Sequence, residues 1–280
     1  MWAARTAGAF GNSLQISTCP SATAYEEVNK TTVADAAMAV GDTVVTVTSA
    51  AGITAGDIVN FGDEYEYRVV SVATNDLNIV RKDEPAYFGT SESSGLHQAP
   101  TNGAQVRRRW KYYDLFDKAP GTSPYAQAKS GVNDELHIVV IDEDGDITGT
   151  KGDVLEKFEA VSKASDAKTA QGSVNYYPDV IYKASNYIYW MDHNAGGSNW
   201  GSAAAGTTFT DVTSVSNVSL QAGSDGTAAT IGQRKTAYEK FQDGETVDVG
   251  LIIAGAGDAT HIGNLITIAE NRKDAVVFAS

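Results

Sequence analysis

The sequence predicts an α+β fold, in which a mixed sheet with packed helices and a C-terminal βαβ unit carries an inserted small antiparallel β-barrel or sandwich domain. Three observations predict it. Residues 247–279 place a helical run between two apolar strands, the pattern of a parallel crossover. Residues 41–81 contain four short β-branched runs with turn residues between them, which is typical of a small antiparallel domain. Residues 136–141 form a long apolar run outside both regions.

The small antiparallel domain is predicted as an insertion at residues 30–103. The turn dipeptides Gly56-Asp57 and Asn75-Asp76 supply backbone conformations that β-branched residues resist. Residues 89–104, rich in Ser, Gly, Pro and Thr, are interpreted as the linker that returns to the core. The four predicted strands lie at residues 41–48, 55–61, 65–72 and 77–81, and the first of them alternates apolar and polar residues.

The core is predicted at residues 1–29 and 104–280, on both sides of the insertion. Residues 106–113 and 136–141 are its predicted strands before residue 150. Residues 154–162 are ambiguous, because their apolar side chains have helical spacing while Val at both ends favours a strand.

The C-terminal region begins with a turn-rich loop at residues 221–226, followed by a helical run through Tyr238 and Phe241. Strands at residues 247–254 and 275–279 then flank a helix at residues 260–271, and we expect both strands to be parallel and buried. Natural domain boundaries normally lie in exposed linkers. Because the sequence stops one residue after a strand that we expect to be buried, the chain is predicted to be a fragment, truncated at the C-terminal end of its core.

Several motifs resemble the contractile-tail sheath proteins of tailed, myovirus-type phages. One is the C-terminal series: a Leu-x-x-Gly-x-Asp-Gly loop at residues 220–226, a helix, a strand ending in Ile-Ala-Gly, a second helix and a final strand ending in Ala-Ser. Segments similar to the preceding part of the sheath core lie at residues 133–148, 155–162, 176–181 and 185–188, and residues 8–16 are similar to the first strand of that core. The resemblance covers residues 1–18 and 130–280.

The resemblance implies a helical tube of many copies of this chain around an inner tail tube, capped by baseplate and tail terminator proteins. It implies contraction by rigid-body rearrangement of subunits, in a virion tail assembled in the host cytoplasm. It also implies that residues 154–162 form a strand. Sheath subunits are linked by extended terminal arms, and we expect these arms to be missing from residues 1–280. No catalytic residues of the family exist to carry over.

The bulk composition narrows the class of partner. A net charge of −14 argues against nucleic acid or an anionic membrane as the main partner, because both favour clustered Lys and Arg. The one cysteine, Cys19, excludes an intrachain disulfide and is expected to be a small, semi-buried residue. The sequence has no apolar run of about 18 residues and no secretory signal, so neither a membrane-spanning helix nor secretion is predicted.

Two stretches resemble ligand sites without completing one. Asp142, Asp144 and Asp146 have the spacing of a calcium loop, but Ile147 replaces the required Gly and Asp153 the bidentate Glu. Asp144-Gly145 is therefore interpreted as a two-residue hairpin tip. Gly255, Gly257 and Asp258 lie at a strand-to-helix turn, as in a dinucleotide fingerprint, but Thr260 stands where the third Gly is needed. We expect no metal and no cofactor.

The remaining polar candidates do not form a catalytic pattern. His97, His137, His193 and His261 are dispersed without metal-ligand spacing, and no Gly-x-Ser-x-Gly motif supports a hydrolase. We therefore predict no catalytic residues and no enzyme activity. The basic cluster at residues 107–111 is interpreted either as solvated surface or as a site that pairs with acidic patches on a neighbouring subunit.

A dense group of aromatic residues is predicted to be mostly core, with its exposed members suited to a subunit interface: Tyr176, Tyr177, Tyr182, Tyr187, Tyr189, Trp190 and Trp200. Together these observations favour a structural subunit of a contractile tail sheath. The alternative is a carbohydrate-binding or adhesive β-rich module, indicated by the Ser/Thr/Gly-rich loops and the aromatic residues. An enzyme on a nucleotide-binding α/β fold comes third.

Overall fold

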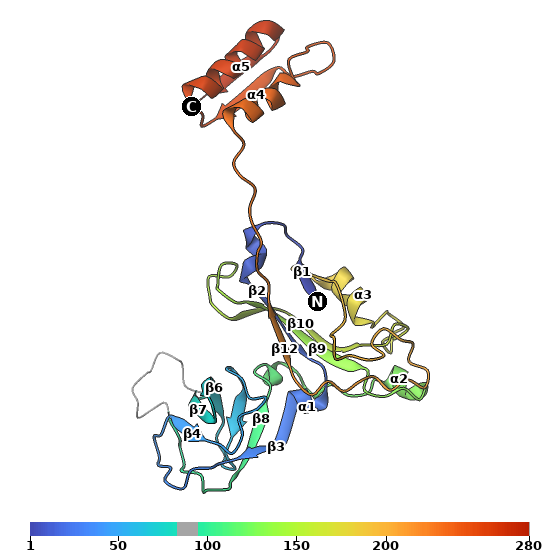
Figure 1. The fold of residues 1–280 in the computed structure, drawn as a ribbon. Coiled ribbons are helices and arrows are strands. Elements are labelled where there is room, and N and C mark those ends of the chain that lie inside the picture. The colour runs from blue at the N-terminus through green and yellow to red at the C-terminus, as the bar shows by residue number, and fades with distance from the viewer. Residues whose placement is uncertain (83–94, 280) are drawn as a thin grey trace. The chain divides into compact units, whose positions relative to one another are not determined.

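A computed structural model describes residues 1–82 and 95–279 (Figure 1). It divides into two units, Met1–Ser224 and Asp225–Ser280, and each is described here by itself. Both contain helices and sheets, which confirms the predicted α+β class.

The first unit contains an antiparallel sheet of four strands in the order β10-β9-β2-β12. Strand β9 is buried along its whole length, and its apolar residues pack on both faces of the sheet. Residues 153–162 form a strand, as the family resemblance implied, with a bulge between Phe158 and Val161 that gives Ala160 a φ of 47°. The strands are β2 (Leu14–Cys19), β9 (Glu135–Asp142), β10 (Asp153–Ser162) and β12 (Ser216–Ser219).

Short elements surround this sheet. Strand β1 (Trp2–Ala4) pairs with β11 (Ile188–Trp190), so the start of the chain lies beside residues about 185 positions later. The helical segments are η1 (Ala9–Ser13), α1 (Ala22–Tyr25), η2 (Tyr113–Leu115), α2 (Pro124–Ala128) and α3 (Tyr177–Ala184). None of these segments was expected from the sequence, nor were β1, β11 and β12.

A second sheet in the same unit has six antiparallel strands in the order β3-β8-β5-β6-β7-β4 and encloses its own apolar core. An isolated bridge between Val33 and Val47 joins the ends of its two edge strands without forming a closed barrel. The strands are β3 (Glu26–Thr32), β4 (Val44–Thr46), β5 (Ile58–Asn60), β6 (Tyr67–Ala73), β7 (Asp76–Arg81) and β8 (Gln105–Arg109).

The second sheet contains all four strands expected between residues 41 and 81, and two more. Strands β4 and β5 are shorter than predicted, β6 is shifted by one or two residues, and β7 begins one residue earlier. Residues 106–113 were predicted as a strand of the core, which is wrong, because β8 pairs with β3 and β5. In this pairing, Val106 of β8 is buried in the apolar core of the six-stranded sheet. The division into an insertion at residues 30–103 and a core at residues 1–29 and 104–280 stays a prediction, and the linker expected at residues 89–104 lies partly outside the described residues.

The second unit is the predicted βαβ arrangement, preceded by a helix. Strands β13 (Leu251–Gly255) and β14 (Val276–Ala279) are parallel, as expected. Helix α5 (Ala259–Arg272) packs Leu265 and Ile268 against Ile252. Helix α4 (Ile231–Glu239) starts with a capping box formed by Thr230 and Gln233.

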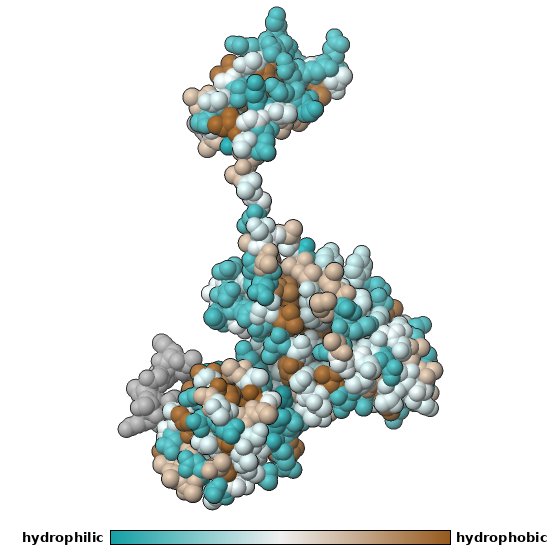
Figure 2. All heavy atoms as spheres, in the orientation of Figure 1, coloured by the Kyte–Doolittle hydropathy of each residue, from teal (hydrophilic) through white to brown (hydrophobic). Residues whose placement is uncertain are grey.

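The expectation that both C-terminal strands are buried is wrong. Leu251, Ile253, Val276 and Phe278 are 52%, 70%, 58% and 60% exposed. In β13 the side chains alternate, so Ile252 faces α5 while its neighbours face away. Figure 2 shows hydrophobic residues among the surface atoms of this unit. A two-stranded sheet covered by helices on one side leaves the other side open; we call these four residues the apolar strand face.

Candidate functional site

The arginines of the basic cluster in β8 form ion pairs with acidic residues of the same chain. Arg108 is buried, and its guanidinium pairs with Asp57 at 3.3 Å and donates to the Ala24 carbonyl at 2.9 Å. Burial raises the pKa of Asp57, although Arg108 opposes this shift. The guanidinium therefore bridges the six-stranded sheet and α1.

The neighbouring arginines, Arg107 and Arg109, face the other side of β8, because side chains alternate along a strand. Arg109 pairs with Glu26 at 3.0 Å and with Glu66, and Arg107 lies 3.4 Å from Glu26. The interpretation that this cluster pairs with a neighbouring subunit is wrong for Arg108 and Arg109, because both already form ion pairs with acidic residues of the same chain. The sequence could not show this, since the partners lie 43 to 83 positions away.

Three other cations line a groove of about 680 Å³ in the first unit. Arg68, Lys111 and Lys151 form no side-chain hydrogen bond or ion pair with any other described residue. Glu143 also lines the groove and accepts a hydrogen bond from Gln15 Nε2. Burial lowers the pKa of Lys111, Arg68 lowers it further, and Glu143 opposes both. In a chain of net charge −14, this basic groove is a surface suited to an acidic partner.

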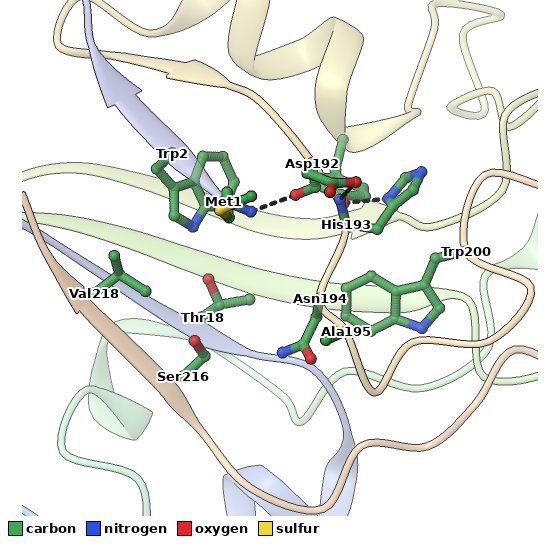
Figure 3. A pocket seen from close by; sticks show the side chains of 11 residues that line it. Met1, Trp2, Thr18, Asp192, His193, Asn194, Ala195, Trp200, Ser216 and Val218 are labelled. Atoms are coloured by element: carbon green, nitrogen blue, oxygen red, sulfur yellow. Dashed lines mark hydrogen bonds between the residues drawn. The ribbon is translucent and has the colours of Figure 1, made fainter.

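A second cavity, of about 430 Å³, lies between β1, the four-stranded sheet and the loop that follows β11 (Figure 3). We call it the aromatic pocket. Trp2, Tyr177 and Trp200 supply its aromatic lining, and Thr18, Ser216 and Val218 come from β2 and β12. Asp192, His193 and Asn194 come from the loop. Its volume lies within the range of about 300–1,000 Å³ typical of small-molecule sites.

A hydrogen-bonded network fixes one wall of the aromatic pocket. The Tyr177 hydroxyl accepts from Trp190 Nε1 at 3.0 Å and lies 2.6 Å from His193 Nδ1. Burial lowers the pKa of His193, and Asp192 opposes this shift, so the neutral imidazole accepts from Tyr177. Gly201 has a φ of 87°, and a Cβ there would lie 2.7 Å from His193 Nε2. The network thus requires glycine at this position.

The other aromatic residues singled out in the sequence divide between core and surface. Tyr176, Tyr187 and Trp190 are half-buried. Tyr182 and Tyr189 are exposed, and the Arg5 guanidinium lies 4.3 Å from the Tyr189 ring centroid. The sequence missed Trp2 and Thr18 as pocket residues, because the pocket forms only when β1 pairs with β11.

Beneath the pocket, Lys163 is buried and its ammonium group lies 5.1 Å from the Trp200 ring centroid. The Nζ atom donates to the carbonyls of Pro20 and Asn133, both at 2.7 Å. Burial lowers the pKa of Lys163 to about 8, although Asp211 and Asp134 favour its charged form. This lysine ties three loops together below Trp200.

Residues 143–152, which contain part of the calcium-loop pattern, form the loop that connects β9 to β10. The interpretation of Asp144-Gly145 as a two-residue hairpin tip is therefore wrong in length, although β9 and β10 do form an antiparallel hairpin. Burial raises the pKa of Asp142, but hydrogen bonds from Ser13, Thr148 and Ile147 outweigh it and hold the pKa well below its usual range. Asp142 accepts from the amides of Gly145, Ile147 and Thr148, so its carboxylate organises the loop.

The strand-to-helix turn after β13 is occupied by the chain itself. Asp258 is the N-cap of α5, and its carboxylate accepts from the His261 amide at 2.8 Å. A phosphate at this helix start would compete with that carboxylate. The geometry gives this turn a capping role.

The histidines and the cysteine lie apart. His97 stacks on Tyr65 at 4.1 Å, His137 is buried in β9, and His261 is buried against Tyr238. Within residues 1–82 and 95–279, no three His, Cys, Asp or Glu side chains are grouped as a metal site. Cys19 is buried, and burial raises its pKa to about 12, which disfavours the nucleophilic thiolate.

Comparison with curated proteins finds a distant relative. The whole chain is 24% identical, over 291 aligned residues, to the tail sheath protein of Salmonella phage ViI. The chain spans 42% of the length of that protein. No protein-family model matches the chain, and no solved structure matches it significantly. In the part of the chain that the structure describes, no helix is both long and apolar enough to cross a membrane.

Proposed function

We propose that this chain is part of the structural subunit of a phage contractile tail sheath. The observation that carries the proposal is the similarity to the sheath protein of phage ViI, which extends along the whole chain. In this proposal, copies of the subunit polymerise around an inner tail tube, meet baseplate and tail terminator proteins at the ends, and contract by rigid-body rearrangement. The subunit is assembled in the host cytoplasm and resides in the virion tail.

Two surfaces support a role in assembly. The apolar strand face exposes four large side chains on a two-stranded sheet, and large exposed apolar patches are typical of protein contacts. The basic groove offers three cations that have no ion-pair partner among residues 1–82 and 95–279, which fits charge-directed contacts between copies of one acidic protein. Two different surfaces of this kind suit head-to-tail contacts, which generate helical assemblies when they do not close into a ring.

The proposed subunit works without catalysis, metal or cofactor. The groups that could perform chemistry have structural roles: Asp142 organises a loop, Asp258 caps a helix, and Cys19 is buried as a thiol. The separate apolar core of the six-stranded sheet supports a small inserted domain, whose strands β3 and β8 extend beyond the predicted bounds of residues 30–103. No nucleic acid and no membrane is a partner in this proposal.

The test is assembly of the protein expressed from its complete reading frame, followed by sedimentation and negative-stain electron microscopy. Helical tubes with a regular subunit repeat are expected. The variant Lys151→Glu should reduce the polymerised fraction, because it reverses a charge in the basic groove, whereas Lys183→Glu, on an exposed face of α3, should not. A protein that stays monomeric at every concentration would contradict the proposal.

A second candidate function is a carbohydrate-binding or adhesive module. The aromatic pocket favours it, because aromatic rings and unpaired polar groups meet there. The two functions differ in where the protein lies on a phage particle, along the tail or at its tip.

A further inference from the structure

The aromatic pocket contains polar groups that the fold leaves without partners. Thr18 is only 6% exposed, lines the pocket, and its hydroxyl forms no hydrogen bond with any described residue. Among the described residues, the fully buried polar side-chain atoms that lack a partner belong to Tyr112, Thr169 and His261, so the Thr18 oxygen is not sealed from solvent. It is open to the pocket and available to a ligand. Figure 3 shows Thr18 and Ser216 in the space between Trp2 and Asn194.

A second hydroxyl without a hydrogen-bond partner among the described residues lies beside Thr18. Ser216 on β12 is the direct cross-strand partner of Thr18 on β2, so both side chains project from the same face of the sheet. The Ser216 hydroxyl likewise has no hydrogen-bond partner among the described residues. Two adjacent hydroxyls that each donate and accept thus form the floor of the pocket.

The loop after β11 adds two more polar atoms that form no hydrogen bond with the described residues. Asp192 uses Oδ1 to accept from the His193 amide, and Asn194 uses Oδ1 to accept from Gly196. The second carboxylate oxygen of Asp192 and the amide nitrogen of Asn194 accept and donate no hydrogen bond within the described residues, although the Met1 ammonium interacts electrostatically with Asp192. The pocket therefore presents two hydroxyls, a carboxylate oxygen and an amide donor beside the rings of Trp2 and Trp200.

We propose that the aromatic pocket binds a neutral saccharide unit. A sugar ring has apolar C–H faces that pack against aromatic rings and an edge of hydroxyls that both donate and accept, so it satisfies both kinds of wall. A purely apolar ligand would leave Thr18 and Ser216 unpaired. The Met1 ammonium also lines the pocket, donates to the Asp192 carbonyl and balances the charge of the Asp192 carboxylate, so the charges of the pocket suit a neutral ligand. The inference does not rest on the sheath proposal, because a tail subunit or an adhesive module could each carry such a pocket.

The test uses methyl glycosides of glucose, galactose, mannose and N-acetylglucosamine as probes. Binding is measured by two-dimensional NMR and by tryptophan fluorescence, at up to about 100 mM, where a site with a Kd of about 1 mM is saturated. Saturable shifts at pocket residues with at least one glycoside are expected. Failure of all four probes to bind would overturn the proposal.

Two isosteric or near-isosteric variants separate binding from folding. Thr18→Val should weaken glycoside binding by about 3–10-fold, the effect of one lost hydrogen bond, without lowering the melting temperature, because the hydroxyl has no partner in the fold. Ser216→Ala should act in the same way. Ser219→Ala, on the same strand but the opposite face, is the matched control and should bind normally. Equal binding by all three variants would overturn the proposal, as would a pocket that is filled by a second copy of the chain in solution.

Discussion

His137 Nδ1 accepts a hydrogen bond of 2.9 Å from the Ala160 amide, which lies in the bulge of β10. The other ring nitrogen, Nε2, bonds the Lys118 carbonyl at 2.8 Å, and the ring stacks on Phe116 at 4.2 Å. Both nitrogens are thus used by the neutral imidazole. A proton on Nδ1 would break the bond that holds Ala160 at its positive φ of 47°.

This geometry predicts a pH dependence of stability. Burial lowers the pKa of His137, although the Lys118 carbonyl and Glu159 favour the charged form. The folded pKa therefore lies below the unfolded value of about 6.5, so the unfolded chain binds more protons and stability falls as the pH drops below about 6.5. His193, whose pKa is also lowered, adds to the same slope.

The measurement is urea denaturation at about pH 7.5 and about pH 5 for the natural chain and for His137→Gln. Glutamine has no titrating group, so the variant should lose less stability between these two pH values. An identical loss in both proteins would show that His137 does not titrate in this way.

Arg108→Met should destabilise the first unit by about 3–5 kcal/mol, because it leaves the buried Asp57 carboxylate without its cation. Arg107→Met is the matched control: its side chain is 40% exposed, so the change should be within about 0.5 kcal/mol. Denaturant unfolding of both variants checks the difference. Equal effects would mean that the Arg108–Asp57 pair is not the connection described above.

Asp142→Asn should loosen residues 143–152, because the neutral amide cannot accept as many hydrogen bonds as the carboxylate. Hydrogen exchange should show loss of protection at the amides of Ile147 and Thr148. Asp144→Asn, at an exposed loop position, should leave them protected. We also expect no stoichiometric calcium binding by calorimetry; binding that Asp144→Asn abolishes would contradict the assignment of this loop.

The double variant Ile253→Thr/Phe278→Thr should keep the C-terminal unit folded and reduce self-association, because both side chains belong to the apolar strand face. Ile252→Thr should instead destabilise the unit by about 2–4 kcal/mol, since Ile252 is buried against Leu265 and Ile268. Circular dichroism and light scattering distinguish the two outcomes. Undiminished association of the double variant would exclude this face as a contact.

The sequence predicted the elements whose signal is local. The βαβ pattern after residue 247 and the β-branched runs of the small sheet carry their own periodicity, and the structure contains them. Strands β1, β11 and β12 have only three or four residues each, and they exist because partners up to about 200 positions away pair with them. The burial of the C-terminal strands was overestimated, because an apolar run does not show what covers it.

Some residues of the aromatic pocket could be singled out from the sequence and others could not. Tyr177 and Trp200 belong to the aromatic group that stands out in the sequence. Thr18 and Ser216 do not stand out, since single hydroxyl residues are common in this chain. Their open hydroxyls become visible only when the register of β2 and β12 places them side by side.

The most direct test of the sheath proposal is immunogold electron microscopy of phage particles from cells that express this gene together with its neighbouring genes. The antibody is raised against residues 1–224, the larger of the two units. The proposal predicts gold label along the whole length of the tail, at a regular spacing. Label confined to the tail tip or its fibres would contradict the sheath proposal and favour the adhesive module.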